Sequence, residues 1–400
     1  MKINVFSYVF WPEEFLINEF VESLSSSHEV NVLTGLPNYP KGDFFQGYGV
    51  LKGPYYQVYK RSVIYRYPVV PRGRSLKGLA LNYFTHTLGA SLRQMYLPKA
   101  DWAFVFATSP ILTCLPAILW AKLKGGKVCI WLQDLWPESL SATGAFAPQS
   151  LIFKLVGHIV RWIYKNVDLI LLQSPSFEAN LDRYGYRGPR HVLYNWASND
   201  FSENAGLADW LVIKDSSQFI ITFAGNVGKA QSLDTMIKAA QILVDQKNIV
   251  FYVVGDGSEL PAARRLSESL GLKNIVFWGR RPAADMPQLF KKSHALLVTL
   301  KNEEIFSRTI PSKIQSYMAA GRPILASING VGRQIVETSG AGLGSPAEDA
   351  KILAENILKL SQMTEIQRRM MGEKGQAFYL ENFQREQVLK IALDYLERYK

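Results

Sequence analysis

Lys313 begins a segment that is predicted to be a helix, within the stretch TIPSKIQSYMAAGRPILAS. A cation is unfavourable at a helix N-terminus, because the helix dipole and the free N–H groups of the first turn attract anions. A lysine in this position therefore favours a bound phosphate, which it would clamp as a point charge beside the amide groups of Ser312 and Lys313. The alternative is a solvated surface lysine.

A second candidate phosphate motif follows the apolar run QFIITFA, in the stretch GNVGKAQSLD. Gly225 and Gly228 permit the backbone to approach a phosphate closely, with Asn226 between them and Lys229 directly after. The stretch GDGSE after the next apolar run is a weaker signal, because many strand-to-helix turns have such a sequence. These features occur at successive strand ends, and together they favour the phosphate interpretation of Lys313.

Carboxylates and amides follow the strands predicted in the first half of the chain. Asp134 and Glu138 flank an aromatic residue in QDLWPES, an arrangement that suits sugar hydroxyls or a general base, although helix caps use the same residue types. The loops FWPEEFLINEF and GLPNYPKGDF carry four further polar candidates: Glu14, Asn18, Asn38 and Tyr39. Acids in the first of these two loops could instead serve as ordinary helix-dipole partners.

Loops of this kind require parallel strands, and the chain repeats the alternation of strands and helices twice. Apolar runs predict the strands KINVFSY, EVNVLT, WAFVFA, KVCIWL and DLILLQ in the first half, and QFIITFA, NIVFYVVG, NIVFWG, HALLVTL and RPILAS in the second. We therefore predict an α/β protein of two doubly wound, Rossmann-like domains, residues 1–196 and 197–380, which face each other across a cleft. A final helix, residues 381–400, could return to the first domain.

The composition of the 400 residues, 48% hydrophobic and 20% charged, is that of a folded chain long enough for two domains. Cys114 and Cys129 lie in apolar runs without CxxC spacing, which argues against a zinc site or a disulfide framework and fits a reducing cytoplasm. Residues 102–121 are uncharged and long enough to span a membrane, but Thr-Ser-Pro at 108–110 interrupts them. That break predicts a buried strand followed by a helix, and hence a peripheral protein.

One segment of the chain is strongly basic. The formal net charge is +11, and residues 44–100 contain no Asp or Glu although lysines, arginines and tyrosines alternate there. Such a segment predicts contact with an anionic surface, either lipid head groups or nucleic acid, with a solvated basic face as the alternative.

The order of the motifs PNYPKG, QDLWPES, FAGNVGKAQSLD, VVGDGSE and TIPSKIQSYMAAGRPILAS resembles the family-4 glycosyltransferases of the GT-B fold across essentially the whole chain. More narrowly, it is similar to the O-antigen, capsule and colanic-acid subgroup. The resemblance implies metal-independent, retaining transfer of a sugar, N-acetyl-L-fucosamine, from a UDP donor to a polyprenyl-diphosphate-linked saccharide, with no cofactor. Together with this resemblance, the absence of acids from residues 44–100 predicts that this segment docks the enzyme on the inner face of the cytoplasmic membrane as a peripheral protein, with no nucleic-acid partner.

The resemblance also implies roles for individual residues. Asp134 would lie next to the reacting sugar, while Lys229 and Lys313 would stabilise the leaving diphosphate. The remaining donor contacts are expected from Gly225, Asn226, Gly228, Arg280, Arg281, Ser312 and Gln315. The acceptor contacts are expected from Glu14, Asn18, Asn38, Tyr39 and Glu138.

The sequence departs from the family pattern at four positions. Arg308 and Ser316 replace two glutamates that the family carries across the IPSK segment, so the usual ribose contact is expected to be absent or moved to Gln315. Asn226 and Gln231 replace the arginine and lysine of the glycine loop, which leaves the two lysines named above as the expected cations.

Two other functions remain open from the sequence. A UDP-sugar 2-epimerase of the GT-B fold also cleaves a UDP-sugar, but it requires an acid/base group aimed at a ring carbon and no lipid-facing surface. A nucleic-acid-binding protein would explain the basic segment but not the glycine loops.

Overall fold

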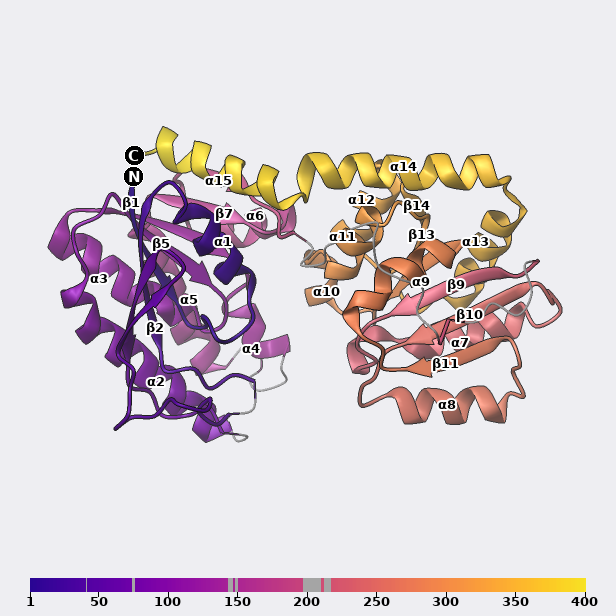
Figure 1. Ribbon diagram of the computed structural model, residues 1–400, viewed down its shortest axis with the longest axis horizontal. Helices are drawn as coiled ribbons and strands as arrows, with labels where there is room; N and C mark the ends of the chain where they lie inside the picture. The colour runs from indigo at the N-terminus through magenta and orange to yellow at the C-terminus, as the bar shows by residue number, and fades with distance from the viewer. Residues whose placement is uncertain (41, 74–75, 143–146, 148–149, 197–209, 212–216) are drawn as a thin grey trace. The chain divides into compact units, whose positions relative to one another are not determined.

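The computed structural model describes residues 1–40, 42–73, 76–142, 147, 150–196, 210–211 and 217–400. The chain divides into two compact units (Figure 1). The first comprises Met1–Tyr194 and Val388–Lys400, and the second comprises Asn195–Gln387. Each unit has a sheet of its own and is described by itself.

The first unit contains an eight-stranded sheet in the order β3-β4-β2-β1-β5-β6-β7-β8, in which β3 and β4 pair antiparallel and the other neighbours pair parallel. The strands are β1 (Lys2–Ser7), β2 (Glu29–Gly35), β3 (Tyr56–Tyr59), β4 (Ser62–Tyr67), β5 (Trp102–Ala107), β6 (Lys127–Leu132), β7 (Leu169–Leu172) and β8 (Arg190–Val192). The helices are α1 (Leu16–Leu24), α2 (Leu76–Arg93), α3 (Cys114–Lys124), α4 (Glu138–Ala142), α5 (Leu151–Lys165), α6 (Glu178–Arg183) and α15 (Arg385–Arg398).

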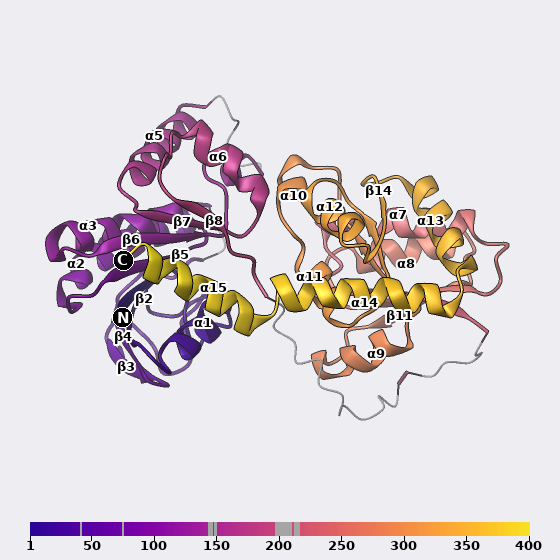
Figure 2. The same ribbon diagram turned by 90° about the horizontal axis from the view of Figure 1, so that it is seen from above.

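Helices cover both faces of this sheet (Figure 2). On one face, α2, α3 and α5 close a core that includes Phe6 and Ile118. On the other face, the Phe20 ring of α1 stacks 4.8 Å from the Phe104 ring, and Trp102 Nε1 donates to the carbonyl of Leu396 in α15 at 3.0 Å. β5 and β7 are buried along their whole length, because parallel strands with helices on both faces meet no solvent.

The second unit contains a six-stranded parallel sheet in the order β11-β10-β9-β12-β13-β14. The strands are β9 (Phe219–Ala224), β10 (Ile249–Val254), β11 (Ile275–Gly279), β12 (Ala295–Thr299), β13 (Ile324–Ser327) and β14 (Gly342–Ser345). The helices are α7 (Leu233–Ile242), α8 (Leu260–Ser269), α9 (Met286–Lys292), α10 (Glu304–Arg308), α11 (Ser312–Ala319), α12 (Val331–Thr338), α13 (Ala350–Gln362) and α14 (Glu365–Asn382).

The chain order reverses between β1 and β5 in the first sheet and between β9 and β12 in the second. In open parallel sheets, ligands bind beyond the carboxyl ends of the strands at such reversals. The loops that carry the predicted site residues follow β1, β2 and β6 in the first unit and β9, β11 and β12 in the second. The fold therefore brings the predicted residues to one edge of each sheet.

The predicted fold class is confirmed, and each predicted apolar run forms a strand. The prediction missed β3 and β4, whose Tyr-rich sequence lies in the segment that was interpreted by its charge, and it missed the short strands β8 and β14. The expected break within residues 102–121 is also confirmed, since β5 ends at Ala107 and α3 begins at Cys114. Among the described residues, no helix combines the length and the apolar composition needed to cross a membrane.

The interpretation of residues 44–100 as a basic surface is wrong for Arg66. This residue of β4 is 1% exposed, and its guanidinium donates to the carbonyl of Gly35 and to Gln57 Oε1, both at 2.9 Å, and to the carbonyl of Trp11. Burial lowers the pKa of the Arg66 guanidinium, since desolvation penalises its charge. Arg66 therefore supports the sheet edge and the loop after β1, and it is unavailable to a membrane.

Candidate active site

Lys313 lies in the first turn of α11, which no side chain caps. Its Nζ lies 3.5 Å from the centre of the Phe223 ring at the end of β9. The nitrogen is buried and has no hydrogen-bond partner among the described residues. Burial lowers the pKa of Lys313 to about 7, because the ammonium loses its hydration. The site thus contains a buried cation whose described partner is an aromatic face.

Gly225 makes room for this lysine. It follows β9 directly and has a φ of +125°, a conformation that side-chain-bearing residues rarely adopt. A Cβ at this position would lie 2.8 Å from Lys313 Cε. The φ of Gly225 favours glycine, and its contact with the lysine of IPSK joins the two phosphate motifs, which are far apart in sequence, into one structure.

The GDG motif after β10 supports the GNVG loop from the other side. A Cβ at Gly255 would lie 1.8 Å from the carbonyl oxygen of Gly225, and one at Gly257 would lie 2.3 Å from that of Val227. The Val227 N–H donates to the carbonyl of Asp256 at 2.9 Å. Sequence reasoning undervalued this motif, because a close approach of two loops has no local signature.

The amide groups of the GNVG loop are largely used within the protein. The Gly225 N–H donates to the carbonyl of Val254 at 2.9 Å, and the Gly228 N–H donates to Gln231 Oε1 at 3.0 Å. What the two glycines provide in this structure is space for neighbouring groups. The side chains of Asn226 and Lys229 are exposed beside Gly225.

Three other predicted donor contacts lie at the same edge or beside it. Arg280 is exposed directly after β11, whereas the Arg281 guanidinium lies 4.7 Å from the centre of the Trp210 ring and 6.0 Å from that of Trp278. Gln315 is buried and its Nε2 donates to the carbonyl of Asn195 at 2.6 Å. Arg281 and Gln315 thus contact other segments of the second unit, which sequence reasoning did not foresee.

Asp134, in the first unit, has a fixed orientation. Its Oδ2 accepts from the N–H of Ser109 at 2.8 Å and from the Ser109 hydroxyl at 2.7 Å. Ser109 follows β5 and Asp134 follows β6, and these strands are neighbours in the sheet. The carboxylate is therefore held at the carboxyl edge of the first sheet, where the pairing with Ser109 was not predicted.

Glu13, which sequence reasoning passed over in favour of Glu14, joins two loops of the first unit. It is 5% exposed, and its carboxylate accepts from the N–H groups of Tyr39 at 2.7 Å, Asn38 at 2.8 Å and Phe10 at 3.1 Å. Burial raises the pKa of the Glu13 carboxyl, although these three donors oppose the shift. Glu13 thus fixes the loop after β2, while Glu14 is exposed.

Two of the predicted acceptor residues have internal partners. Asn18 donates to the carbonyl of Glu13 at 2.6 Å and accepts from the N–H of Trp11 at 3.1 Å. Glu138 accepts from Asn180 Nδ2 at 2.8 Å and pairs with Arg183 at 3.3 Å. Both side chains organise the loops around the edge of the sheet.

Asn38 and Tyr39 instead belong to a polar and aromatic group with Arg72. Asn38 Oδ1 accepts from the N–H of Arg72 at 3.1 Å, and the Arg72 guanidinium lies 5.5 Å from the centre of the Tyr39 ring. The Tyr8 and Tyr83 rings meet edge to face at 5.7 Å. Burial raises the pKa of both phenols, and the Arg72 guanidinium opposes this shift. Such a group can bind a sugar through ring faces and an anion through the guanidinium.

Residues 218–363, which contain both phosphate motifs, match the protein family described as glycosyl transferases group 1. Most of the second unit is thus similar to the group 1 glycosyltransferases. Two relatives named as glycosyltransferases extend the likeness into the first unit. WbjE of Pseudomonas aeruginosa is 26% identical over 263 residues, which are 64% of this chain and 65% of WbjE. WcaI of Escherichia coli K12, named for colanic acid biosynthesis, is 25% identical over 340 residues, 80% of this chain and 82% of WcaI.

Solved structures of glycosyltransferases share the fold over the whole chain. Anabaena HepE in complex with UDP has a TM-score of 0.69 at 14% identity and covers 100% of both chains. The trehalose-6-phosphate protein from E. coli, bound with UDP-2-fluoro glucose, has a TM-score of 0.72 at 11% identity and covers 100% of this chain and 99% of its own. The fold is therefore GT-B, and the glycosyltransferase class predicted from the sequence is confirmed.

Proposed function

We propose that this glycosyltransferase moves a sugar from a UDP-sugar to a polyprenyl-diphosphate-linked saccharide during synthesis of a bacterial surface polysaccharide of the O-antigen, capsule or colanic-acid type. The observation that carries the proposal is the buried Lys313 ammonium, which has no hydrogen-bond acceptor among the described residues and lies beside the space left by Gly225. A diphosphate would supply the missing negative charge. The name of WcaI, which gives colanic acid biosynthesis, supports the pathway, and UDP in HepE supports the donor.

The reaction follows from the charges at the second unit. Cleavage of the bond between sugar and UDP places negative charge on the leaving diphosphate. Lys313, the exposed Lys229 and the amide groups at the start of α11 stabilise that charge, and the buried Lys313 does so most strongly because little water screens it. A leaving phosphate oxygen accepts the proton of the acceptor hydroxyl, so the sugar is transferred with retention and without a protein nucleophile.

The first unit supplies the acceptor side in this proposal. Asp134, held by Ser109, orients the reacting sugar through its hydroxyl groups. Tyr39 and Arg72, positioned through Glu13 and Asn38, contact the acceptor, whose lipid diphosphate matches the guanidinium in charge. N-acetyl-L-fucosamine is the donor sugar that the motif resemblance favours.

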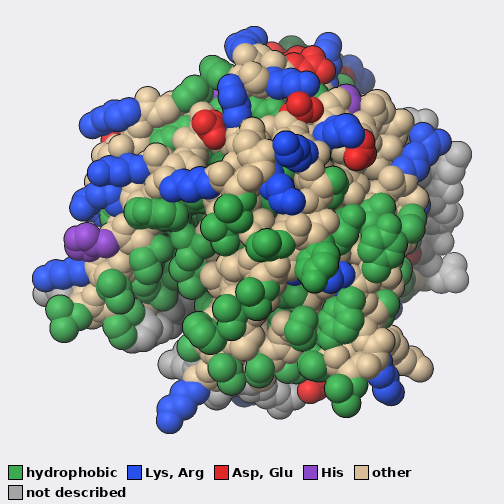
Figure 3. Space-filling view, turned by 90° about the vertical axis from the view of Figure 1, so that its left-hand side faces the viewer, with side chains coloured by type: hydrophobic (Ala, Val, Ile, Leu, Met, Phe, Trp, Pro, Cys, Tyr) green, Lys and Arg blue, Asp and Glu red, His purple; other side chains and the backbone are tan. Residues whose placement is uncertain are grey.

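The lipid-linked acceptor requires a membrane-facing surface, and α2 provides one. Exposed apolar side chains recur every three or four residues along α2, and two more follow in the turn after it. Their exposed fractions are 47 to 69%: Leu81, Phe84, Leu88, Leu92, Met95 and Tyr96. We call these six residues the α2 stripe. Hydrophobic side chains gather on this side of the first unit, with lysines and arginines at the margin (Figure 3). A stripe of this kind inserts into the interface of an anionic membrane.

Ligand binding by the full chain tests the donor assignment. UDP, GDP and TDP are compared by thermal shift on the wild type and on Lys313→Met. Stabilisation by UDP, lost in the variant, is expected, since a ligand of the folded state raises stability by mass action. No shift with any nucleotide would contradict the proposal, and release of UDP from a UDP-sugar without acceptor, together with an altered sugar, would indicate an epimerase instead.

A further inference from the structure

A cavity of about 560 Å³ opens at the opposite edge of the second sheet from the donor loops. Its wall includes residues that precede β12 and β13, Ser293, His294, Arg322 and Pro323, together with residues at the start of β9. The donor loops follow the carboxyl ends of these parallel strands, whereas the cavity lies at their amino ends. The cavity is therefore separate from the proposed UDP site.

Positive charge dominates the cavity. Its lining contains one carboxylate, that of Glu365, and five cationic side chains, from α9, α14 and the loop before β13: Lys291, Lys292, Arg322, Arg368 and Arg369. Arg369 pairs with Glu373 at 3.5 Å. Within the described part of the chain, the other four take part in no ion pair closer than 4.0 Å. The Glu365 carboxylate compensates part of the charge of Arg322 and Arg368, and the described lining of the cavity keeps an excess of cations.

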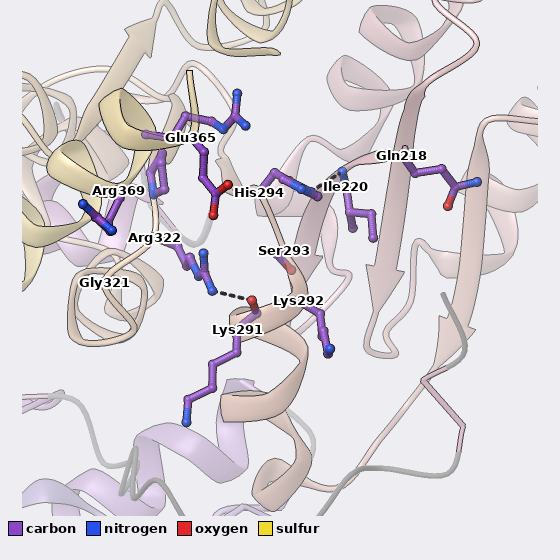
Figure 4. A pocket seen from close by; sticks show the side chains of 12 residues that line it. Gln218, Ile220, Lys291, Lys292, Ser293, His294, Gly321, Arg322, Glu365 and Arg369 are labelled. Atoms are coloured by element: carbon purple, nitrogen blue, oxygen red, sulfur yellow. Dashed lines mark hydrogen bonds between the residues drawn. The ribbon is translucent and has the colours of Figure 1, made fainter. Parts of the chain in front are cut away.

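Interactions with helix ends explain only part of this excess. Lys291 and Lys292 occupy the last turn of α9, where a helix dipole favours cations, and the Arg322 guanidinium donates to the carbonyl of Lys291 (Figure 4). Arg368 and Arg369 occupy the beginning of α14, where the dipole opposes them, although the Arg368 guanidinium also donates to the carbonyls of Leu360, at 3.4 Å, and Met363 at the end of α13. An external anion is the group that would stabilise both sets at once.

The polar groups of the wall are held in place before any ligand binds. Arg368 donates to the carbonyl of Met363 and lies 5.2 Å from the centre of the Phe219 ring. His294 Nδ1 accepts from the N–H of Ile220 at 3.0 Å, which leaves the ring proton on Nε2 as a donor (Figure 4). The wall therefore offers hydrogen-bond donors of fixed position, as a binding site requires.

We propose that this cavity binds a phosphate-bearing anion at a second site, distinct from the donor site. The ligand carries two or more negative charges, since four cations of the lining form no ion pair with the described residues and one carboxylate, that of Glu365, lies among them. Its phosphate is contributed either by a free phosphate compound or by a phospholipid head group. Guanidinium groups bind phosphate oxygens in pairs, and the two lysines add charge without demanding one geometry. The site depends on none of the residues assigned to sugar transfer.

Calorimetric titration of the full chain with pyrophosphate tests the site, with saturating UDP present to fill the donor loops. The double variant Lys291→Gln/Lys292→Gln removes two exposed lysines of the wall, and Lys273→Gln/Lys351→Gln removes two exposed lysines of the same unit outside it. We expect binding to weaken roughly tenfold or more in the first variant and to stay unchanged in the second. If UDP fails to bind, the same pyrophosphate titration is carried out on Lys313→Met. Binding that persists in this variant belongs to the cavity and not to the donor loops.

Sedimentation with phosphatidylglycerol vesicles distinguishes the two phosphate sources. A free phosphate compound is indicated if the Lys291→Gln/Lys292→Gln variant, the wall variant, no longer binds pyrophosphate but still binds vesicles as the wild type does. A lipid head group is indicated if the wall variant no longer binds the vesicles while the matched control variant still does. The proposal is overturned if neither assay separates the wall variant from its control, or if UDP and Lys313→Met each abolish pyrophosphate binding.

Discussion

The Lys313 ammonium lies over the Phe223 ring, 3.5 Å from its centre, and this contact joins the start of α11 to the end of β9. An aromatic face attracts a cation but replaces only part of its hydration. The lysine is therefore a charge that costs stability in the free protein and stabilises the complex with an anion. Its titration provides two predictions.

Lys313→Met is expected to stabilise the free protein most at low pH. The pKa is about 7 in the folded chain and 10.5 in an unfolded reference, so between these values the unfolded chain binds one more proton and wild-type stability rises with pH. The advantage of the variant is constant below about pH 7 and disappears towards pH 10.5. Urea unfolding at about pH 6.5 and about pH 9.5 measures it. The exposed Lys351→Met serves as control, and equal differences at both pH values for Lys313→Met would contradict a buried, titrating lysine.

UDP binding is expected to take up a proton at about pH 8. The bound diphosphate favours the charged form of Lys313 and raises its pKa, so a lysine that is largely neutral in the free protein becomes protonated in the complex. Calorimetry in two buffers of different ionisation enthalpy measures uptake approaching about one proton. Lys313→Met should show none, and the same uptake in wild type and variant would assign the proton to another group.

Gly255→Ala is expected to destabilise the second unit by about 3 kcal/mol or more. Gly255 has a φ of +146°, and an added Cβ would lie 1.8 Å from the carbonyl oxygen of Gly225, so the backbone of the donor loop must shift. Gly271→Ala is the matched control, because Gly271 has a φ of +63° and open space around it, so strain of about 1–2 kcal/mol is its whole cost. Urea unfolding compares the two. Equal costs would mean that the GDG motif does not support the donor loop.

The GDG motif also shows where sequence reasoning stops. Apolar runs predict the strands, and the order of strands places Lys313, Gly225 and Asp134 at sheet edges, because a parallel sheet gathers its carboxyl ends. Close contacts between loops are not encoded locally, so the role of Gly255 was missed. The same holds for Glu13 and Arg66, which are charged but buried, because burial depends on distant segments.

Glu13→Gln is expected to cost about 1–3 kcal/mol of unfolding free energy and to loosen the loop after β2. The glutamine keeps one acceptor oxygen for the N–H groups of Asn38 and Tyr39, but its amide nitrogen then faces the N–H of Phe10, a donor opposite a donor. Urea unfolding and limited proteolysis near Tyr39 measure the two effects. Glu14→Gln, one position along and exposed, should change stability by less than about 0.5 kcal/mol. A neutral result for Glu13→Gln would show that the carboxylate does not hold the loop.

Leu88→Gln/Leu92→Gln is expected to release the protein from anionic vesicles without destabilising it. The two side chains are 49% and 66% exposed in the α2 stripe, so their polar replacements lose little burial on folding and much on insertion into the membrane interface. Ile366→Gln/Leu380→Gln is the matched control, since these residues of α14 are 61% and 50% exposed. Vesicle sedimentation at low and high salt separates the apolar contribution to binding from the electrostatic contribution of the surrounding lysines and arginines, because salt weakens only the electrostatic one. If the α2 variant binds vesicles as the control does, membrane contact occurs elsewhere and the acceptor must reach the site by another surface.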